Sequence, residues 1–336
     1  MSAKILVTGG AGYIGSHTVL KLLESGYEVI VIDSLERGYL EALERVKRLT
    51  GKNLTFVNGD LKNPEVSKSV MRQFKPDCVI HFAAYKSVEE GERNPEMYLE
   101  NNVTATKYLL EGMLENNVKK IIFSSSAAVY GETDILPITE DVSPNPINVY
   151  GKTKLMMENL INEYTIKYEL QSLAFRYFNA VGADSSGQIG EDPRNCTNLI
   201  PIVMQVLSSQ RDKVLLFGDN FNTLDGSQER DYIHVSDLAL AHTKAVEVDL
   251  IDGKMEIVNL STGISTSCKK IFKLAEEISG NTLNYEIVSP RKGDPERVFA
   301  SKNKAFELLN WEPTRDIQES IYNQWNWTIH NPKGYK

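Results

Sequence analysis

The stretch that decides the fold is Thr8-Gly9-Gly10-Ala11-Gly12-Tyr13-Ile14-Gly15, near the start of the chain. Its glycines satisfy two spacings, G-x-G-x-x-G from Gly10 and G-x-x-G-x-x-G from Gly9. Glycine permits a tight turn with positive φ, and it lets the backbone approach a pyrophosphate that a Cβ would block. The free N–H groups and the positive dipole end of a following helix favour phosphates. Many such patterns are only tight turns, so the flanking sequence must show whether this one binds a pyrophosphate.

Strand and helix patterns alternate after this loop. The predicted strands are Lys4–Val7, Glu28–Asp33, Leu54–Asn58, Asp77–Ala84, Lys119–Ser125 and Ser172–Phe178. The predicted helices are Ile14–Ser25, Glu36–Thr50, Pro64–Phe74, Pro95–Asn116 and Asn148–Tyr168. This alternation indicates βαβ units with right-handed crossovers. We therefore predict an α/β fold, with a Rossmann-type doubly wound parallel sheet.

The amino-acid composition of the chain changes after residue 181. Gly182–Asn198 is rich in Gly, Asp, Ser and Asn and predicts a long loop, and Asp219–Asp231 is a second polar stretch. We predict two domains: a dinucleotide-binding Rossmann domain over 1–181 and a smaller mixed α/β substrate lobe over 182–336. The lobe would cover the carboxyl ends of the strands, where ligands bind in open α/β sheets. This division leaves room for part of the second half to return to the first domain.

Asp33 indicates which dinucleotide binds. It ends the second predicted strand, 18 residues after Gly15. A carboxylate at this place accepts hydrogen bonds from the adenosine ribose and repels a 2′-phosphate, so we predict NAD rather than NADP. Arg37 lies nearby and would favour the 2′-phosphate, but we expect it to be solvated. Asp60 follows the third strand, where an adenine edge would lie, and a turn residue is an equally good interpretation.

Tyr150 and Lys154 form a Y-x-x-x-K pair within the predicted helix 148–168. Residues four apart lie one turn apart on the same helix face. A phenol has a pKa near ~10 and is a poor base at neutral pH. We expect the Lys154 ammonium and the positive nicotinamide ring to lower that pKa. The lysine can also hydrogen-bond the nicotinamide ribose.

Ser124-Ser125-Ser126 ends the fifth predicted strand. A hydroxyl at the carboxyl end of a strand can bond a substrate oxygen and relay its proton, and Ser126 is our choice. The alternative is that the run is only a polar strand terminus. Together Ser126, Tyr150 and Lys154 predict an alcohol oxidation site, in which Tyr150 removes a proton while hydride leaves carbon for NAD.

Composition and charge narrow the class of protein. The net charge of −8 argues against nucleic acid as a partner, and no apolar run is long enough to span a membrane. The histidines show no metal-ligand spacing, so we expect no metal. The three cysteines are far apart, and the first residues show no secretory pattern. We therefore expect a reduced, cytoplasmic protein.

Taken together, the glycine loop, Asp33, the serine run and Y-x-x-x-K resemble the extended short-chain dehydrogenase/reductase superfamily. Further segments narrow the resemblance to the UDP-glucose 4-epimerase family over essentially the whole chain. These segments are His81-Phe82-Ala83-Ala84-Tyr85-Lys86, Arg176-Tyr177-Phe178-Asn179, Gly190-Glu191-Asp192-Pro193, Asn198-Leu199-Ile200-Pro201, Arg230-Asp231-Tyr232-Ile233-His234-Val235, Trp325-Asn326-Trp327 and Asn331-Pro332-Lys333-Gly334-Tyr335.

The resemblance implies a set of ligand-binding residues. Those implied for NAD are Gly9, Gly12, Tyr13, Ile14, Gly15, Asp33, Asp60, Leu61, Phe82, Ala83, Lys86, Asn101, Ser124, Tyr150, Lys154 and Tyr177. Those implied for a UDP-sugar are Lys86, Ser126, Tyr150, Asn179, Asn198, Leu199, Phe217, Arg230, Tyr232, Arg291, Asp294 and Val298. A diphosphate favours arginine, whose planar fork makes charge-assisted bonds of roughly 1.5–3 kcal/mol each. For any one of these residues, a surface salt bridge is the alternative.

The resemblance also implies the reaction. Hydride would pass from sugar C4 to NAD, the 4-keto sugar would turn over in the pocket, and hydride would return to its other face. The sequence departs from the family pattern at Ala84-Tyr85, at Ala128 and at Pro290-Arg291-Lys292-Gly293-Asp294, which is followed by Val298. In the family a bulky residue at the last position excludes N-acetylated sugars. Val298 could therefore admit UDP-N-acetylglucosamine, or it could merely pack.

Three rival functions and a dimer remain to be tested. A nucleotide-sugar 4,6-dehydratase needs an Asp-Glu pair where Ala127 and Ala128 stand, and a decarboxylase is opposed only by the resemblance. A non-catalytic NAD-sensing module would not need the intact Tyr-Lys pair. The resemblance implies a homodimer through helices 95–116 and 148–168. The residues that could supply its apolar contacts, or could equally face the sheet, are Tyr108, Leu109, Met113, Met156, Met157 and Leu160.

Overall fold

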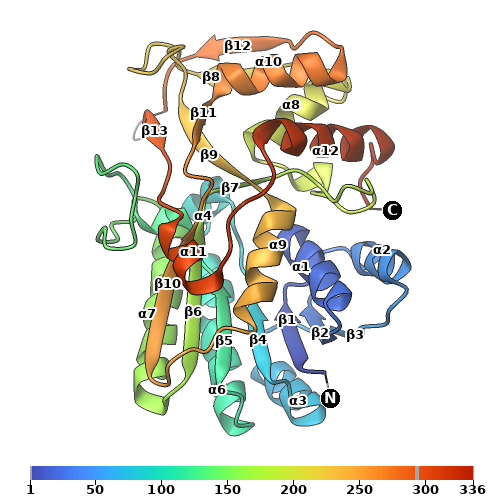
Figure 1. The fold of residues 1–336 in the computed structure, drawn as a ribbon, viewed down its shortest axis with the longest axis vertical. Coiled ribbons are helices and arrows are strands. Elements are labelled where there is room, and N and C mark those ends of the chain that lie inside the picture. The colour runs from blue at the N-terminus through green and yellow to red at the C-terminus, as the bar shows by residue number, and fades with distance from the viewer. Residues whose placement is uncertain (1, 292–294, 336) are drawn as a thin grey trace.

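The computed structural model describes residues 2–291 and 295–335. Seven parallel strands form its main sheet (Figure 1). Their order across the sheet is β10 (Lys254–Leu260), β6 (Gln171–Tyr177), β5 (Lys120–Ser124), β4 (Cys78–His81), β1 (Lys4–Thr8), β2 (Glu28–Asp33) and β3 (Thr55–Asn58). The six strands from β3 to β6 follow the doubly wound order 3-2-1-4-5-6, which confirms the predicted fold class. The point where the order reverses lies between β1 and β4.

Helices cover both faces of this sheet, and each face has its own apolar core. One core packs β1, β2 and β6 against α1 (Tyr13–Glu24), α2 (Leu40–Thr50), α9 (Val235–Ala245) and α11 (Asn303–Leu309). The other packs the opposite face against α3 (Pro64–Phe74), α6 (Ala105–Glu115) and α7 (Val149–Tyr168). Strands buried on both sides are continuous apolar runs, as in Ile5–Val7 and Val29–Ile32.

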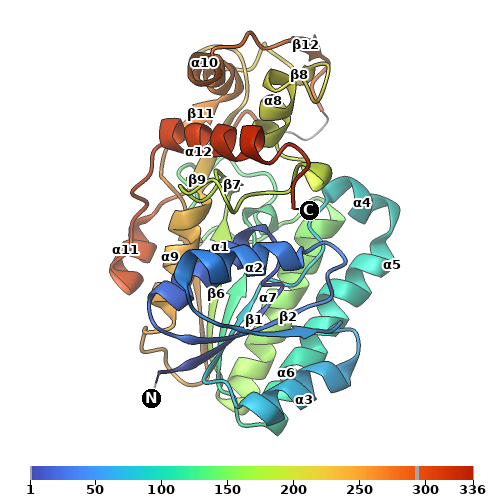
Figure 2. The same cartoon turned by 90° about the vertical axis from the view of Figure 1, so that its right-hand side faces the viewer.

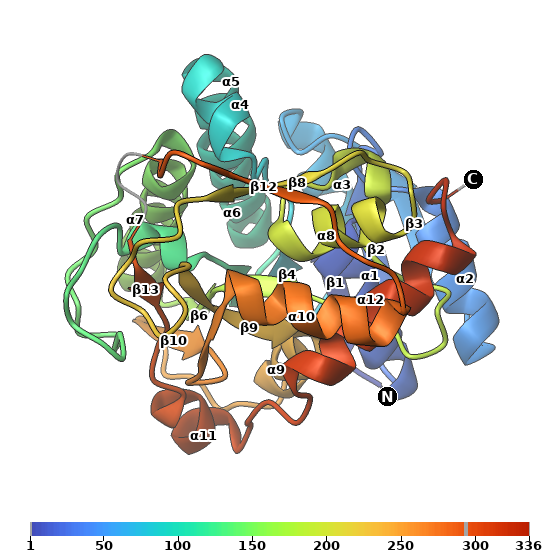
Figure 3. The same ribbon diagram turned by 90° about the horizontal axis from the view of Figure 1, so that it is seen from above.

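The smaller lobe lies above the carboxyl edge of the sheet (Figure 1). It contains a four-stranded sheet of β7 (Asn179–Val181), β9 (Glu229–His234), β11 (Ser265–Ser267) and β13 (Arg297–Val298). It also contains the pair β8 (Val214–Phe217) and β12 (Tyr285–Val288), and α8 (Leu199–Leu207), α10 (Cys268–Ser279) and α12 (Ile317–His330). Seen from above, this lobe extends across the top of the first (Figure 3).

The second half of the chain does not stay in the smaller lobe. Strand β10 pairs with β6 in the main sheet, and α9 and α11 pack on its face. Residues beyond 182 are therefore shared between both lobes. The division predicted from the sequence had allowed part of the second half to belong to the first domain. The predicted loop 182–198 is irregular except for a short 3-10 turn, η3 (Pro193–Asn195).

The predicted helix 95–116 is confirmed as one continuous helical stretch over 95–115, although its middle is not a regular α-helix. Here α4 (Val88–Arg93) and α5 (Pro95–Tyr98) lead into a π-helical segment, η1 (Leu99–Thr104), before α6 begins. The Asn102 side chain accepts from Tyr85 N at 2.8 Å and donates to Thr153 Oγ1 at 3.1 Å. These contacts tie the segment to the neighbouring loop and to α7. In Figure 2, α4 and α5 stand out from the body of the first lobe.

The predicted dimer residues divide into two groups. Leu109, Met113 and Met157 are fully buried in the core under α6 and α7, so they face the sheet. Met156 is exposed, while Tyr108 and Leu160 are half-buried. Only the second group can contribute to a contact with another chain.

Candidate active site

The glycine loop joins β1 to α1 and leaves no room for side chains. Gly9 has a φ of +71°, and a Cβ there would lie 2.7 Å from Ala83 N. A Cβ on Gly15 would lie 2.2 Å from Gly9 O, so the helix can pack on the loop only with glycine. Gly12 caps α1 without a side-chain hydrogen bond, which leaves the first N–H groups of the helix to a ligand.

Asp33 is held in a fixed orientation beside this loop. Its Oδ2 accepts from Ala11 N at 3.0 Å and its Oδ1 from Leu35 N at 2.9 Å. Burial raises the pKa of Asp33, while both hydrogen bonds oppose the shift. Arg37 is exposed, as expected, and its guanidinium pairs with both Glu90 oxygens at 2.6–2.7 Å. The residue that could favour a 2′-phosphate is thus already engaged.

The other predicted cofactor residues surround the same edge. Asp60 Oδ1 accepts from Lys62 N at 2.9 Å, so the turn interpretation of Asp60 is confirmed, and its contact with adenine stays a prediction. Leu61 is buried. Ala83 faces Gly9, and the Phe82 ring packs against His242. Asn101 lies on the π-helical segment. Tyr13 and Ile14 start α1.

Tyr150 lies in the first turn of α7, which Asn148 caps through its Oδ1 and the N–H of Gly151 at 2.8 Å. Burial raises the pKa of Tyr150 above its ordinary value. A hydrogen bond with Ser126 and the positive charge of Lys86 act in the other direction. The predicted hydroxyl partner therefore contacts the phenol, and Ser126 Oγ also accepts from Ala128 N at 3.1 Å.

Lys154 is fixed at the end of β5, and its predicted effect on the pKa of Tyr150 stays a prediction. Its Nζ donates to Ser124 O at 2.7 Å. Burial lowers the pKa of Lys154 itself to about 7, against an opposing effect of Glu158. The positive charge of Lys86, on the loop after β4, favours the phenolate of Tyr150. Sequence spacing within one helix could not show this long-range effect.

Two further hydroxyls lie under this centre. Ser124 Oγ hydrogen-bonds Tyr177 OH, linking the ends of β5 and β6. Burial raises the pKa of Tyr177, with a smaller contribution from Tyr150 in the same direction. Tyr177 is therefore a neutral phenol at physiological pH.

Residues predicted for the nucleotide sugar come together in the smaller lobe. Asn179 Nδ2 donates to Asp231 O at 3.0 Å, joining β7 to β9, and Tyr232 lies one position further along β9. Asn198 caps α8, which Leu199 begins, without a side-chain capping bond. The first N–H groups of this helix are therefore free of a side-chain cap and can donate to an anionic group.

Two arginines of this lobe are predicted to hold the diphosphate. Arg230 on β9 is the register partner of Val298 on β13. The Arg291 guanidinium stacks over the Phe217 ring with 3.7 Å between its carbon and the ring centre. Val298 packs against a small apolar cluster that includes Val129, so its packing interpretation has support. The predicted residue Asp294 lies outside the described residues.

Sequence reasoning missed a buried ion pair beneath the site. Arg176 donates to both oxygens of Glu158, at 2.9 and 2.6 Å, and both side chains are almost fully buried. Ser125 Oγ donates to the same carboxylate. Glu158 follows Lys154 by one helical turn, and Arg176 was part of a recognised segment. The sequence signal for Glu158 was its position four residues after Lys154, which places both side chains on one face of the helix.

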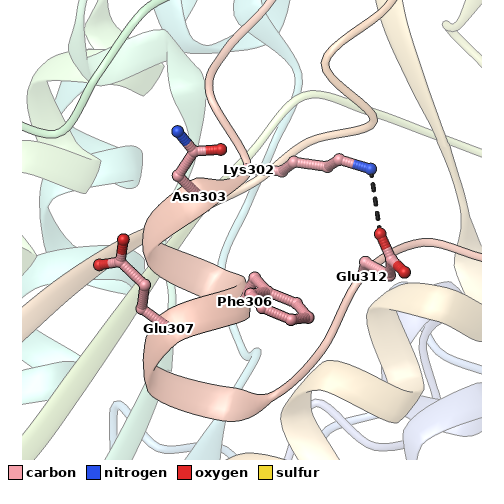
Figure 4. A pocket seen from close by; sticks show the side chains of 5 residues that line it. All are labelled: Lys302, Asn303, Phe306, Glu307 and Glu312. Carbon is pink, nitrogen blue, oxygen red and sulfur yellow. Dashed lines mark hydrogen bonds and ion pairs between the residues drawn. The ribbon is translucent and has the colours of Figure 1, made fainter.

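A surface depression lies apart from this centre. It has a volume of about 380 Å³ and is lined by Lys302, Asn303, Phe306, Glu307 and Glu312 around α11 (Figure 4). A Lys302–Glu312 ion pair of 3.2 Å closes one side. Among the described residues, no group of three or more His, Cys, Asp or Glu could hold a metal ion. No described helix is long and apolar enough to cross a membrane.

Comparison with known proteins identifies the family. A family model described as the NAD dependent epimerase/dehydratase family matches residues 5–261. The chain belongs to this family. A UDP-glucose 4-epimerase of Halalkalibacterium halodurans is 46% identical over 98% of this chain and 97% of that protein. One of Bacillus subtilis is 45% identical over 99% of this chain and 98% of its own length.

Solved structures agree with the placement in the NAD dependent epimerase/dehydratase family. The UDP-glucose 4-epimerase of Bifidobacterium longum, solved in complex with NAD+ and UDP, has a TM-score of 0.95. It is 38% identical and covers 99% of this chain and 100% of that one. The residues matched by the family model include all seven strands of the main sheet except Lys4, the first residue of β1.

Proposed function

We propose that this protein interconverts UDP-glucose and UDP-galactose by transient oxidation at C4 of the hexose. The carrying observation is the group at the carboxyl edge of the sheet, where a hydrogen bond with Ser126 and the positive charge of Lys86 favour the Tyr150 phenolate, together with the uncapped N-terminus of α1. A phenol, a hydroxyl and a cation next to a dinucleotide loop suit reversible oxidation of an alcohol. The named relatives support the choice of substrate.

NAD fits the residues that are present. A Cβ on Gly9 or Gly15 would collide with backbone atoms, and α1 offers N–H groups that no side chain caps. Asp33 presents an oriented carboxylate at the end of β2, and Arg37 is paired with Glu90. When bound, NAD accepts hydride from sugar C4 and returns it. We infer that the glycine loop and α1 hold its pyrophosphate and that Asp33 binds its adenosine ribose.

The protein's own groups handle the proton and the position of the substrate. Tyr150 removes the proton of the 4-hydroxyl and returns it, and Ser126 holds the same oxygen in line. Lys154, fixed by Ser124 O, presents its remaining N–H groups to the nicotinamide ribose. Arg230 and Arg291 hold the diphosphate in the smaller lobe. A firm grip on the UDP portion leaves the hexose free to present either face.

The test is to incubate the purified protein with UDP-glucose and to resolve the sugar nucleotides. We expect an equilibrium mixture with UDP-galactose and no net consumption of NAD. A 4-keto-6-deoxy sugar would show a dehydratase and loss of carbon dioxide a decarboxylase. Binding of NAD without turnover would show a sensing module. Each of these outcomes would overturn the proposal.

A dehydratase is disfavoured by the residues next to Ser126. Ala127 and Ala128 form a 3-10 turn, η2 (Ala127–Val129), and carry only methyl groups. Elimination of water across C5 and C6 needs a general acid and a general base at these positions. Methyl groups can supply neither. Removal of hydride from a single carbon and its return to the same carbon need no group beyond those described above.

We further propose that UDP-N-acetylglucosamine is a second substrate. Val298 is half-buried and lies in register with Arg230, where the sugar would extend from the diphosphate. A Tyr at this position would occupy the space that an N-acetyl group needs. Val298→Tyr should lose activity toward UDP-N-acetylglucosamine and keep it toward UDP-glucose. Equal inertness of both proteins toward the N-acetyl sugar would refute this specificity.

We propose that the protein works as a cytoplasmic homodimer in galactose metabolism. Exposed Met156, with half-buried Tyr108 and Leu160, is the apolar surface available on α6 and α7. Sedimentation equilibrium should give twice the 37.8 kDa chain mass. Met156→Glu should shift the protein toward monomer, because it would bring a charge into the contact. A monomeric wild type at micromolar concentration would refute the dimer.

A further inference from the structure

The last residues of the chain pack into a small apolar cluster beside the cofactor lobe. The Trp327 side chain is 1% exposed and that of Tyr335 is 6% exposed, although Tyr335 is the last described residue. Their neighbours in the cluster are Ala42 on α2, Ala183 after β7 and the half-buried Tyr39. The C-terminus accordingly lies next to α2 (Figures 1 and 2). A chain end that is buried in this way must be held by specific contacts.

Hydrogen bonds fix Tyr335 to the loop that follows β7. Its OH accepts from Gly190 N at 2.9 Å and donates to Gly190 O at 3.0 Å. Its backbone N donates to Asp192 Oδ2 at 3.0 Å, and Arg194 donates to its carbonyl oxygen at 2.9 Å. Gly334 has a φ of +68°, and a Cβ there would lie 2.1 Å from the same Asp192 oxygen. Tyr335 is therefore held by its backbone and by its hydroxyl.

The Tyr335 ring in turn packs on Tyr39, which precedes α2. The two ring centres are 5.6 Å apart and the ring planes are inclined by 30°. The Arg194 guanidinium lies over the Tyr39 ring at 4.6 Å. Arg45 on α2 lies 5.2 Å from the centre of the Tyr335 ring and donates to Asn331 Oδ1 at 2.6 Å. Aromatic pairs and cations over rings stabilise a contact beyond the area that they bury, so the chain end and the start of α2 form one packed unit.

Tyr39 is joined to the glycine loop by backbone contacts. Tyr39 N donates to Ala11 O at 3.0 Å, and Ala11 N donates to Asp33 Oδ2 at 3.0 Å. A Cβ on Gly38 would lie 2.7 Å from Asp33 Oδ1 and 3.0 Å from the Ala11 side chain. The segment that carries Tyr39 therefore lies directly against the loop and the carboxylate that we assign to the NAD pyrophosphate and ribose.

We propose that Tyr335 is a positioning residue for the dinucleotide site. It holds Tyr39, and through Tyr39 it holds the glycine loop and Asp33 in the geometry that binds NAD. The inference rests on the part of the proposed function that places NAD at this loop, and it does not depend on the sugar chemistry. Because Tyr335 follows α12 of the smaller lobe, the affinity for NAD is coupled to the seating of the C-terminal segment.

Tyr335→Ala tests the proposal, because it removes the ring that packs on Tyr39 and keeps the backbone contacts of Tyr335. The dissociation constant for NAD is measured by calorimetry on cofactor-free protein, well below the unfolding temperature. It should rise about three- to tenfold, which is the effect expected from losing one aromatic pair. Tyr335→Phe keeps the ring and should restore most of the affinity. An unchanged constant in Tyr335→Ala, or equal weakening in both variants, would overturn the proposal.

A control on α12 separates positioning from stability. Ile321 is fully buried in the core of the smaller lobe, in a cluster that does not include Tyr39. Ile321→Ala should lower the melting temperature, because it leaves a cavity, and should leave the dissociation constant for NAD unchanged. Equal loss of NAD affinity in Ile321→Ala and Tyr335→Ala would overturn the proposal, since destabilisation alone would then explain both results.

Tyr39→Ala tests the path of the effect. It removes the other ring of the pair and keeps the backbone N–H that bonds Ala11. Tyr39→Ala should weaken NAD binding by a similar factor, and the double variant Tyr39→Ala/Tyr335→Ala should be little weaker than either single variant, because both remove the same contact. Full additivity of the two effects would refute a path through Tyr39.

The reverse effect gives a second readout, because coupling between two sites is reciprocal. In hydrogen exchange, NAD should slow the exchange of the peptide that contains Tyr335, relative to a peptide from α10, in the wild type and not in Tyr39→Ala. Equal protection in the two proteins would refute the role of Tyr39. A wild type that bound NAD and formed no UDP-galactose would refute the proposed function, while the affinities would still decide the role of Tyr335.

Discussion

The buried pair of Glu158 and Arg176 gives the sharpest stability prediction, through Glu158→Gln. The pair joins α7 to β6 directly beneath Lys154. Arg176 also stacks over the Tyr130 ring at 4.7 Å, and its Nη1 is buried with no hydrogen-bond partner among the described residues. Removal of the carboxylate charge leaves a buried guanidinium without its counterion.

The magnitude follows from that burial. The side chains are 2% and 3% exposed, so water cannot replace the lost partner. Breaking a buried ion pair from one side costs about 3–5 kcal/mol. Replacing both partners by apolar residues of similar volume is often close to neutral, because both desolvation penalties disappear. Glu158→Gln should therefore destabilise the protein more than the double variant Glu158→Leu/Arg176→Met.

The assay is urea unfolding followed by tryptophan fluorescence, with the free energy of unfolding extrapolated to water. The control is Glu89→Gln, because Glu89 pairs with Arg93 on α4 where both side chains are more than 70% exposed. Exposed pairs contribute little to stability, so this variant should match the wild type. A loss below about 1 kcal/mol for Glu158→Gln would refute the reasoning, since it would mean that water solvates Arg176.

Two other perturbations follow from burial and from glycine geometry. Burial lowers the pKa of His242 to about 4, so the unfolded state binds a proton below pH 6.5 before the folded state does, and acid favours unfolding. His242→Phe should reduce the wild-type loss of unfolding free energy between pH 6.5 and 4 by roughly 3 kcal/mol. The variant His330→Gln, at an exposed histidine, should leave that loss unchanged. Equal acid sensitivity of His242→Phe and wild type would contradict this reasoning. Gly15→Ala should abolish NAD binding in calorimetry, because its Cβ would lie 2.2 Å from Gly9 O; wild-type affinity would contradict it.

Most of the main sheet could be predicted from local patterns. Strands such as Glu28–Asp33 are apolar runs bounded by turns, and their spacing from the helices fixes a parallel arrangement. The glycine loop and Asp33 could be recognised for the same reason, since each lies at a strand end. The strand 77–84 was predicted too long, because the chain leaves the sheet after His81 to bring Ala83 against Gly9.

What sequence could not show depends on contacts between distant segments. The pairing of β10 with β6 joins residues about 80 apart, and no local pattern indicates it. Lys86 and Glu191 are 105 positions apart, so neither spacing nor periodicity points to their ion pair. The π-helical segment before α6 carries Asn102, whose contacts with Tyr85 and Thr153 again join residues that are far apart along the chain.

Conversion of UDP-glucose to UDP-galactose by Tyr150→Phe tests the central claim most directly. Phe keeps the ring and its packing and removes only the hydroxyl that contacts Ser126. The account predicts a fall in kcat of about 10²–10⁴-fold with NAD still bound, because the proton of the 4-hydroxyl loses its acceptor. Turnover at the wild-type rate would contradict it.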